Sequence, residues 1–386
     1  MSAFKKSLSV LSPTAAAIAA AIATVSLTPS ALAGTIRHDR SDWQYRSLAN
    51  NFSSVGFLSA RNSSNSRGWG CSGTLIARSY VLTAAHCVES GGSFMNQGTF
   101  TVGNRRYSVN AVGAHRDWFN SGGDLGLGVD LAVVSLSQNV WNVNPALLYS
   151  GRDEDLKRGT YVGYGMTGTG DTGAYINGGT KRAGQNIMGI GTRLGYNDRL
   201  LVSDFDDPRN ANSNWLSQPL DLEYQLAWGD SGGGMFIDGR VAGVHSFISA
   251  PEDRRVDADY GDTSASVRVS SWTSWIRGAA NSIARLLGRS NPPIASSSGA
   301  TSSSRGGNRP AEIPLPDEYN WFDENIFVDP ISDVGFEEYE NGGPVFEGET
   351  LIDPPKDVPE PSMLLGSFAI LGMLTRLRRR SRSGRS

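Results

Sequence analysis

The sequence predicts an all-β domain of the barrel or sandwich class, followed by one helix. Short apolar or alternating runs bounded by glycine, asparagine or aspartate have the length and composition of β-strands. They are 73–76, 80–83, 131–136, 160–164, 235–237 and 241–248. Asp238-Gly239, between the last two runs, is a tight-turn signal for a β-hairpin. Many short strands joined by glycine-rich turns, in a chain with 46 glycines, are typical of barrels and sandwiches.

After Ser270 the pattern changes to that of a helix. Apolar residues recur at helical spacing behind serines that can cap a first turn. They are Trp272, Trp275, Ile276, Ala279, Ile283 and Leu287. We expect this helix to lie on the domain surface, because its polar face is not basic enough to favour the alternative, a helix on a membrane.

The composition limits the classes of protein to consider. With 386 residues, 39% of them hydrophobic, the chain can bury the core of one large domain or two small ones. Its two cysteines allow at most one internal disulfide, which excludes a disulfide-dense scaffold. The formal net charge of −3 argues against nucleic acid as a partner. Neither the cysteines nor the four histidines have metal-ligand spacing, so we expect no metal and no cofactor.

The N-terminus resembles a secretory signal peptide. Lys5 and Lys6 precede an alanine-rich apolar run over 15–25, and Ala31-Leu32-Ala33 has small residues at the positions that a signal peptidase recognises. The order of charge, apolar run and cleavage site argues against an ordinary buried helix. We therefore expect residues 1–33 to be removed and the rest to fold outside the cytoplasm, where a disulfide persists.

The C-terminus, 358–386, resembles a PEP-CTERM sorting signal of Gram-negative envelopes. Val358-Pro359-Glu360-Pro361 precedes an apolar stretch over 363–377 and an arginine cluster. As a helix this stretch reaches about 22 Å, short of the roughly 30 Å hydrocarbon core, although arginine snorkelling relieves part of the mismatch. The resemblance implies at least transient membrane contact and cleavage by an exosortase. The alternative is a tail anchor that is not processed.

The segment between domain and sorting signal, 289–357, is predicted to be a disordered linker. Residues 291–310 are dominated by serine, glycine and proline, which cannot offset their ordering entropy by burial. Residues 311–357 hold fourteen Asp or Glu against the single Lys356, with aromatic residues scattered among them. A solvated, self-repelling acidic spacer is the favoured interpretation. The alternative is an acidic-aromatic segment that docks on a partner or on the chain's own folded domain.

Gly229-Asp230-Ser231-Gly232-Gly233 can present a reactive hydroxyl. A serine between glycines sits on a tight turn, and the same turn can direct the backbone N–H groups of Gly229 and Ser231 at one point. Such a pair can hold the oxyanion of an acyl-transfer intermediate, and one donor typically contributes about 2.7 to 4 kcal/mol. Alone, the motif is also compatible with an ordinary turn.

Two further motifs supply a base and a carboxylate. His86, in Thr83-Ala84-Ala85-His86-Cys87, has an ordinary pKa of about 6.5, which suits proton transfer at neutral pH. Asp130 opens a buried apolar strand and can accept the other imidazole N–H, which sets the tautomer. Taken singly, each residue has a structural interpretation: a histidine beside a strand and a solvated aspartate at a strand start.

Together the three motifs resemble those of the trypsin-like (chymotrypsin-fold) serine endopeptidases. Histidine, aspartate and serine follow in that order, separated by 44 and 101 residues. The resemblance covers 34–288 and implies two six-stranded antiparallel barrels with a cleft between them and a C-terminal helix packed back on the domain. It also implies that His86 is the general base, Asp130 its orienting partner and Ser231 the nucleophile.

The same resemblance implies a disulfide between Cys71 and Cys87, since the family has a bridge at the corresponding positions. The two cysteines lie 16 residues apart and bracket the strand pair that leads to His86. A closed loop of this length contributes about 3 kcal/mol in the chain-entropy model.

The sequence departs from the family in its activation motif. Most members expose an Ile-Val-Gly-Gly terminus whose ammonium pairs with the aspartate next to the nucleophile, here Asp230, and this chain has no such motif. Cleavage after Ala33 leaves Gly34-Thr35 ahead of Ile36. Either a further trim exposes Ile36, or Asp230 has another partner.

Selectivity is the second departure. Gln225 stands where tryptic members carry an aspartate, and a neutral amide does not attract Lys or Arg as a buried carboxylate does. His245 and Ser246 align with the strand that lines the pocket and binds substrate backbone. Glutamyl endopeptidases carry a histidine at the position of His245, which suggests the hypothesis that an acidic or polar residue precedes the scissile bond. The alternative is a structural histidine in the barrel wall.

Two functions follow from these patterns. The favoured one is a secreted, surface-sorted serine endopeptidase of a bacterial envelope or extracellular matrix. It would act on proteins or peptides and would itself be processed by signal peptidase and an exosortase-like enzyme. The alternative is a catalytically silent, protease-like adhesion or matrix-binding module. The complete set of His86, Asp130 and Ser231 favours the enzyme.

Overall fold

The computed structural model describes residues 34–62, 68–210, 216, 218–251, 253–297 and 326–331. The predicted signal peptide, the predicted sorting signal and most of the linker lie outside these residues. Within them, no helix is both long enough and apolar enough to cross a membrane.

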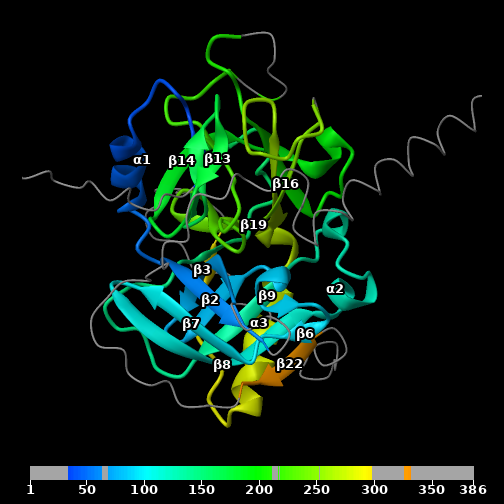
Figure 1. The fold of residues 1–386 in the computed structure, drawn as a ribbon. Coiled ribbons are helices and arrows are strands. Elements are labelled where there is room, and N and C mark those ends of the chain that lie inside the picture. Colours follow the sequence, from blue (N-terminus) through cyan, green and yellow to red (C-terminus); the bar gives the residue numbers. More distant parts are fainter. Residues whose placement is uncertain are drawn as a thin grey trace, which may run out of the picture. The chain divides into compact units, whose positions relative to one another are not determined.

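The first of the two large sheets closes into a six-stranded barrel. Its order is β22-β8-β7-β2-β3-β4-β9, and a further ladder between β8 and β9 completes the ring (Figure 1). Its strands are β2 (Val55–Arg61), β3 (Trp69–Ala77), β4 (Tyr80–Thr83), β7 (Gln97–Val102), β8 (Arg105–His115), β9 (Ala132–Leu136) and β22 (Ile326–Pro330). Leu58, Leu75, Val81, Phe100 and Val133 are completely buried in its core. The all-β prediction is confirmed, as is the first predicted barrel.

The second large sheet follows the path β14-β11-β18-β19-β20-β16-β15, with β10 and β21 added beside β19. Its strands are β10 (Leu148–Tyr149), β11 (Arg158–Gly163), β14 (Arg182–Ile187), β15 (Gly189–Ile190), β16 (Leu200–Asp204), β18 (Gly234–Ile237), β19 (Arg240–Ser249), β20 (Thr263–Arg268) and β21 (Ser296–Ser297). Asp238 and Gly239 join β18 to β19 with φ values of 48° and 72°, so the predicted hairpin is confirmed.

The expectation of a second closed six-stranded barrel is wrong, because this sheet forms a half-barrel. Among the described residues, no ladder joins β14 to β16. The edge of β14 that is not paired with β11 contacts residues 222–223 instead. The Gln185 N–H donates to the Leu222 carbonyl over 2.6 Å, and Gln185 forms a β-bridge with Glu223. The Asn186 side-chain amide donates to the Asp204 carbonyl. These contacts satisfy the β14 edge without a closing strand.

Smaller elements connect the two sheets. A four-stranded sheet has the order β13-β12-β1-β17, and β5 pairs with β6. These strands are β1 (Gly34–Ile36), β5 (Glu89–Ser90), β6 (Ser93–Phe94), β12 (Thr167–Thr169), β13 (Gly173–Ile176) and β17 (Tyr224–Gln225). The helices are α1 (Asp42–Ala49), α2 (Arg116–Asn120) and α3 (Thr273–Leu286), and the 3₁₀ turns are η1 (Ala85–Cys87), η2 (Leu125–Leu127), η3 (Gly191–Leu194) and η4 (Val269–Ser271).

The predicted C-terminal helix is confirmed as α3, which packs on β8 and β9. Trp275, Ile276, Ala279 and Ile283 are buried along one face. A Cβ on Gly113 of β8 would lie 3.2 Å from the Ile283 side chain, so helix and barrel are in close contact there. The helix therefore covers the first barrel, as expected for an apolar stripe of this width.

The linker is not disordered throughout, which corrects that part of the prediction. β21 pairs with β10, and β22 pairs antiparallel with β8, from Ile326 opposite His115 to Pro330 opposite Ala111. Ile326 is buried, and the Phe327 ring lies 5.1 Å from that of Phe119. Within an acidic stretch these apolar side chains provide the burial that ordering requires. For 326–331 the alternative interpretation, docking on the chain's own domain, is the correct one.

Candidate active site

The first barrel brings His86 and Asp130 together. Thr83 at the end of β4 pairs with Ala132 at the start of β9, so the residues just beyond these two ends are neighbours. The His86 Nδ1 lies 2.7 Å from the Asp130 Oδ2, and the His86 backbone N–H donates to the Asp130 Oδ1 over 3.0 Å. Two contacts from one residue hold both carboxylate oxygens and set the orientation of the imidazole ring.

Asp130 is completely buried and still carries a lowered pKa. Burial alone would raise the pKa of this carboxyl. The charge of His86 and hydrogen bonds from His86 and Ser246 outweigh burial and hold the pKa below its ordinary value. The carboxylate is therefore ionised at neutral pH and can stabilise an imidazolium beside it.

Ser231 lies on a tight turn between β17 and β18. Gly229 and Gly232 adopt φ values of 93° and 77°, a region that favours glycine. A Cβ on Gly232 would lie 2.1 Å from the Thr83 Oγ1, so the turn presses directly against the strand that leads to His86. The flanking glycines thus permit the close approach of the two sheets that the site requires.

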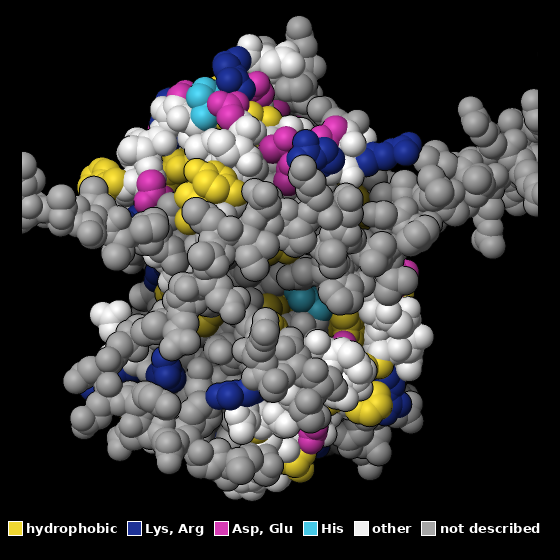
Figure 2. All heavy atoms as spheres, in the orientation of Figure 1, with side chains coloured by type: hydrophobic (Ala, Val, Ile, Leu, Met, Phe, Trp, Pro, Cys, Tyr) yellow, Lys and Arg dark blue, Asp and Glu magenta, His cyan; other side chains and the backbone are white. Residues whose placement is uncertain are grey.

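One pocket joins the residues from the two sheets. It is lined by His86, Leu125, Leu226, Ala227, Trp228, Ser231, His245, Ser246, Phe247 and Ile248. His86 comes from the first barrel, Ser231 from the turn before β18, and Asp130 lies behind His86. Figure 2 shows a histidine side chain in the hollow at the middle of the face it displays. The structure therefore brings together the three residues that the motifs nominated.

The predicted oxyanion donors are available. Among the described residues, neither the Gly229 N–H nor the Ser231 N–H has a hydrogen-bond partner. Their carbonyls, in contrast, are both held by Ser72: its N–H donates to the Ser231 carbonyl over 2.8 Å and its hydroxyl to the Gly229 carbonyl over 2.9 Å. The Ser72 Oγ in turn accepts the Tyr164 N–H over 2.9 Å. Ser72 thus holds the turn that carries Gly229 and Ser231 by both of their carbonyls.

Sequence reasoning missed Ser72. The signal available was its position directly after Cys71, which the disulfide ties to the histidine segment. Serine at that place has no periodicity or motif of its own, and its partners are 92 and 157 residues away. Only the fold shows that its hydroxyl bridges the two sheets.

Ser246, which we predicted to bind substrate, contacts Asp130. Its hydroxyl donates to the Asp130 Oδ2 over 2.6 Å, while the residue itself lines the pocket. The Asp130 carboxylate therefore has partners from both sheets. This link couples the position of the aspartate to β19.

Asp230 has partners other than an N-terminal ammonium. Its Oδ1 accepts the Gly165 N–H over 2.8 Å, and its Oδ2 accepts the Ala227 N–H over 3.0 Å and the Tyr224 hydroxyl over 3.2 Å. Ile36 lies within β1 opposite Tyr224. Burial raises the pKa of Asp230 to about 7, partly opposed by these hydrogen bonds. Asp230 thus has other partners in the chain that retains residues 1–33, and a trim that exposes Ile36 stays a prediction.

Gln225 is completely buried, with its Oε1 accepting the Ser264 hydroxyl over 2.6 Å. Its Nε2 has no hydrogen-bond partner within the described part of the chain. Gln225 is not among the residues that line the pocket with Ser231, so its predicted role in selectivity stays a prediction.

His245 has the geometry of a structural histidine. Its ring stacks on Tyr161 with centroids 5.4 Å apart, its Nε2 accepts the Val162 N–H over 3.3 Å, and its Nδ1 lies 3.1 Å from the Ser266 Oγ. Burial lowers its pKa to about 3. Both ring nitrogens are occupied and the ring is neutral at neutral pH, so it presents no charge to an acidic side chain.

Cys71 and Cys87 form the implied disulfide, with their Cα atoms 6.0 Å apart. It links β3 to η1, the turn that carries His86. The Trp69 indole N–H donates to the Cys87 carbonyl over 2.9 Å and adds a second tie to the same turn. The histidine segment is thereby tied to β3 by two contacts.

One acidic cluster has metal-like geometry. Asp257, Asp259 and Asp262 each offer a carboxylate oxygen, and these oxygens lie within 4.8 Å of one another. Burial and mutual repulsion raise the pKa of Asp259 to about 7 and that of Asp262 to about 8. None of the three residues lines the pocket that contains Ser231.

Comparison with known proteins gives the following matches. A family model described as Trypsin matches residues 44–276. Among solved structures, the chain is similar to neuropsin, a serine protease expressed in the limbic system of mouse brain, at 16% identity over 60% of this chain and 96% of that one, with a TM-score of 0.45. It is also similar to the HL collagenase, at 19% identity over 67% and 99% of the two chains, with a TM-score of 0.45.

Proposed function

This chain belongs to the trypsin family, and on that premise we propose that it is a serine endopeptidase whose catalytic residues are His86, Asp130 and Ser231. The observation that carries the proposal is the double contact of His86 with the Asp130 carboxylate, behind a pocket that also contains Ser231.

The geometry supports the following reaction. Asp130 accepts the Nδ1–H of His86, which leaves Nε2 as the proton acceptor. His86 removes the proton from the Ser231 hydroxyl as the oxygen attacks the substrate carbonyl. The oxyanion that forms is bound by the N–H groups of Gly229 and Ser231. His86 then gives its proton to the leaving amine, and water hydrolyses the acyl-enzyme by the same steps in reverse.

We propose a non-tryptic preference. Its support is that the described residues lining the pocket include no carboxylate that could pair with a basic side chain, and that Gln225, which is buried and precedes Leu226 of the pocket in sequence, is neutral. The acidic preference stays a prediction, and the neutral, fully bonded state of His245 weighs against it. Cleavage of a peptide library tests both: enrichment of Lys or Arg before the scissile bond contradicts the first, and absence of Glu or Asp contradicts the second.

Secretion and surface sorting are part of the same proposal. Their support is the order of charge, apolar run and cleavage site in 1–33 and of Pro-Glu-Pro, apolar run and arginines in 358–386. Signal peptidase and an exosortase-like enzyme are the processing partners this predicts, and the C-terminal run is its transient membrane contact. N-terminal sequencing of the active protein is expected to begin at Gly34.

Covalent labelling decides between the enzyme and a silent adhesion or matrix-binding module. A fluorophosphonate probe is expected to label the wild-type chain at Ser231 and to leave Ser231→Ala unlabelled. Ser150→Ala, a serine outside the pocket, is the matched control and is expected to label fully. A folded wild-type chain that does not react would favour the silent module.

A further inference from the structure

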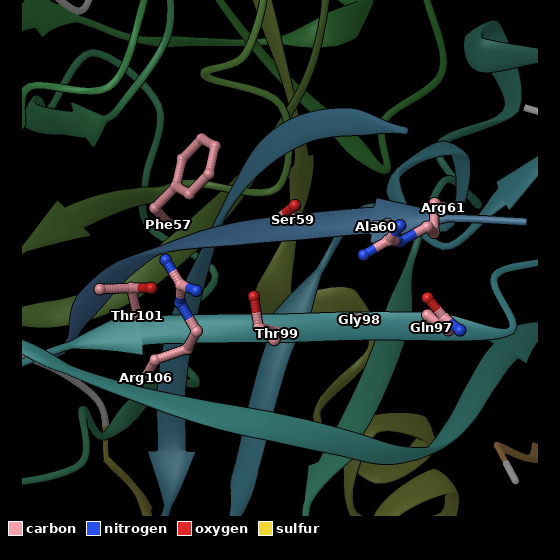
Figure 3. Close-up of a pocket in the computed structure, with 9 residues that line it drawn as sticks. All are labelled: Phe57, Ser59, Ala60, Arg61, Gln97, Gly98, Thr99, Thr101 and Arg106. Atoms are coloured by element: carbon pink, nitrogen blue, oxygen red, sulfur yellow. The ribbon is translucent and has the colours of Figure 1, made fainter. Parts of the chain in front are cut away.

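The outer face of the first barrel carries a groove with an arginine at each end. Its volume is about 150 Å³, and it lies over β2, β7 and the start of β8 (Figure 3). The polar side chains that line it are Ser59, Arg61, Gln97, Thr99, Thr101 and Arg106. This groove, called the arginine groove below, is separate from the pocket that contains Ser231.

Strand register explains how the arginine groove is built. Phe57, Thr101 and Arg106 form one cross-strand row, and Arg61 faces Gln97 in another. The two rows lie four positions apart along β2, which corresponds to about 13 Å. Figure 3 shows Ser59 and Thr99 between the two arginines. The groove therefore has two cations at its ends and hydroxyl groups in its middle.

The charge of the arginine groove is uncompensated. Arg61 and Arg106 are exposed, and neither has a carboxylate partner among the residues that the structure describes. Guanidinium groups and hydroxyls together are suited to carboxylates on an extended peptide. The chemistry of the groove thus calls for an acidic chain segment.

The position and direction of β22 place an acidic segment of this chain close to the groove. β9 occupies one edge of β8, so β22 and β7 share the other edge. β22 runs antiparallel to β8, and the Ile331 N–H donates to the Asn110 carbonyl over 3.0 Å. An extension of β22 beyond Ile331 in the same direction would approach the Arg106 end of β8, where β7 already fills the edge. A segment that continued along this line would pass over the outer face, where the arginine groove lies.

We propose that residues 333–340 of this chain occupy the arginine groove. This segment carries Asp333, Glu337, Glu338 and Glu340 and no Lys or Arg. Asp333 lies two residues past Ile331, a reach of about 7 Å, and Glu338 lies seven residues past it, a reach of about 23 Å. That length exceeds the distance between the two arginines. β22 thus holds the first part of the acidic linker on the barrel, and ion pairs with the arginine groove hold the residues that follow.

Protection from proteolysis tests this docking. The full chain is used with Ser231→Ala, so that the readout does not depend on the proposed activity. Chymotrypsin is added, and mass spectrometry follows cleavage after Phe336 and Tyr339. The double variant Arg61→Glu/Arg106→Glu is expected to be cut there about three- to tenfold faster than the parent at low salt, the factor that a few exposed ion pairs provide. Salt at about 0.5 M is expected to remove the difference.

Two further variants separate docking from a general change in charge. Arg152→Glu/Arg158→Glu makes the same change at exposed arginines of the second half and is expected to be cut at the parent rate. Adding Glu337→Lys/Glu338→Lys to the reversed groove is expected to restore protection. Equal cleavage of the groove variant and the parent at low salt would overturn the proposal. An equal increase in the cleavage rate of the Arg152→Glu/Arg158→Glu control would also overturn it. So would a groove variant that weakens the binding of a separately added acidic peptide but leaves cleavage after Phe336 and Tyr339 unchanged.

Discussion

The two halves of the domain treat a buried aspartate in opposite ways. Asp130, at the closed first barrel, and Asp230, at the open second sheet, are both completely inaccessible. The first has a lowered pKa because the His86 charge and its hydrogen bonds outweigh burial. The second has a pKa raised to about 7 because burial prevails over hydrogen bonds from two backbone amides and the Tyr224 hydroxyl and over the charge of Arg182. The comparison shows that equally complete burial leaves the pKa to the partners: a charged imidazole with several hydrogen bonds keeps one carboxyl ionised, whereas the weaker partners of the other do not offset burial.

The largest effect is expected from removing His86 or Ser231, which lie in different halves of the domain. His86→Ala removes the contribution of the first barrel and Ser231→Ala that of the second. Because the two residues act as one unit, each single variant and the double variant are expected to lose a similar factor in kcat, about 10⁶. Measurement of kcat on a common peptide, with circular dichroism to check folding, tests this. Losses that multiply in the double variant would mean that the residues act independently.

A smaller effect is expected from removing the Ser72 hydroxyl, which joins the two halves of the domain. Ser72→Ala keeps the backbone bond to the Ser231 carbonyl but removes the bond to the Gly229 carbonyl. Loss of one such orienting bond, about 1.4 kcal/mol, is expected to lower kcat about tenfold. KM and the pH dependence of kcat are expected to stay unchanged, because neither the pocket nor His86 is altered.

The Ser72 prediction has a matched control on the same barrel. Ser108→Ala removes a hydroxyl from β8, away from the nucleophile turn, and is expected to keep wild-type kcat. A decrease in thermal stability without a change in kcat for Ser72→Ala would instead assign the residue a purely structural role.

The smallest expected effect concerns the pH dependence of stability. Burial, with the nearby Asp206 and Asp204 charges, raises the pKa of Glu223 in the second half to about 9. The folded state thus holds this proton more tightly than the unfolded chain. The free energy of unfolding should therefore fall as pH rises from about 4.5 to about 9. His115 beside α3 acts in the opposite direction, because burial lowers its pKa to about 4 and stability is lost as pH falls below about 6.5.

Glu223→Gln is expected to reduce the fall in the free energy of unfolding as the pH rises. Urea unfolding at several pH values between about 5 and 9 measures it. Asp238→Asn, in the exposed turn between β18 and β19, is the control and is expected to keep the wild-type slope. An unchanged slope in Glu223→Gln would show that this carboxyl is not the source of the decline.

Much of the candidate site could be predicted from the sequence because its residues lie in local motifs. Gly229 and Gly232 adopt positive φ values that favour glycine, so the turn that carries Ser231 can be recognised from consecutive residues. The hairpin at Asp238-Gly239 and the stripe of α3 are local in the same sense. These features depend on interactions between residues that are close along the chain.

Other features depend on residues that are far apart. The bridge from Ser72 to Gly229, the bond from Ser246 to Asp130 and the docking of β22 on β8 each join segments separated by more than a hundred residues. Nothing in the pattern of one segment specifies which edge or carbonyl the other will present. The open second sheet escaped prediction for the same reason, since the partner of the β14 edge lies beyond an intervening loop.

The amino-acid order by itself determined the reactive groups and the turns that carry them, because backbone sterics and apolar periodicity act over a few residues. Tertiary structure alone decided which of these groups are joined by hydrogen bonds and which titratable groups are neutral. It alone also decided where the acidic linker begins to pair with the first barrel. Those properties depend on the electrostatic surroundings of each group, and the surroundings exist only after distant strands have come together.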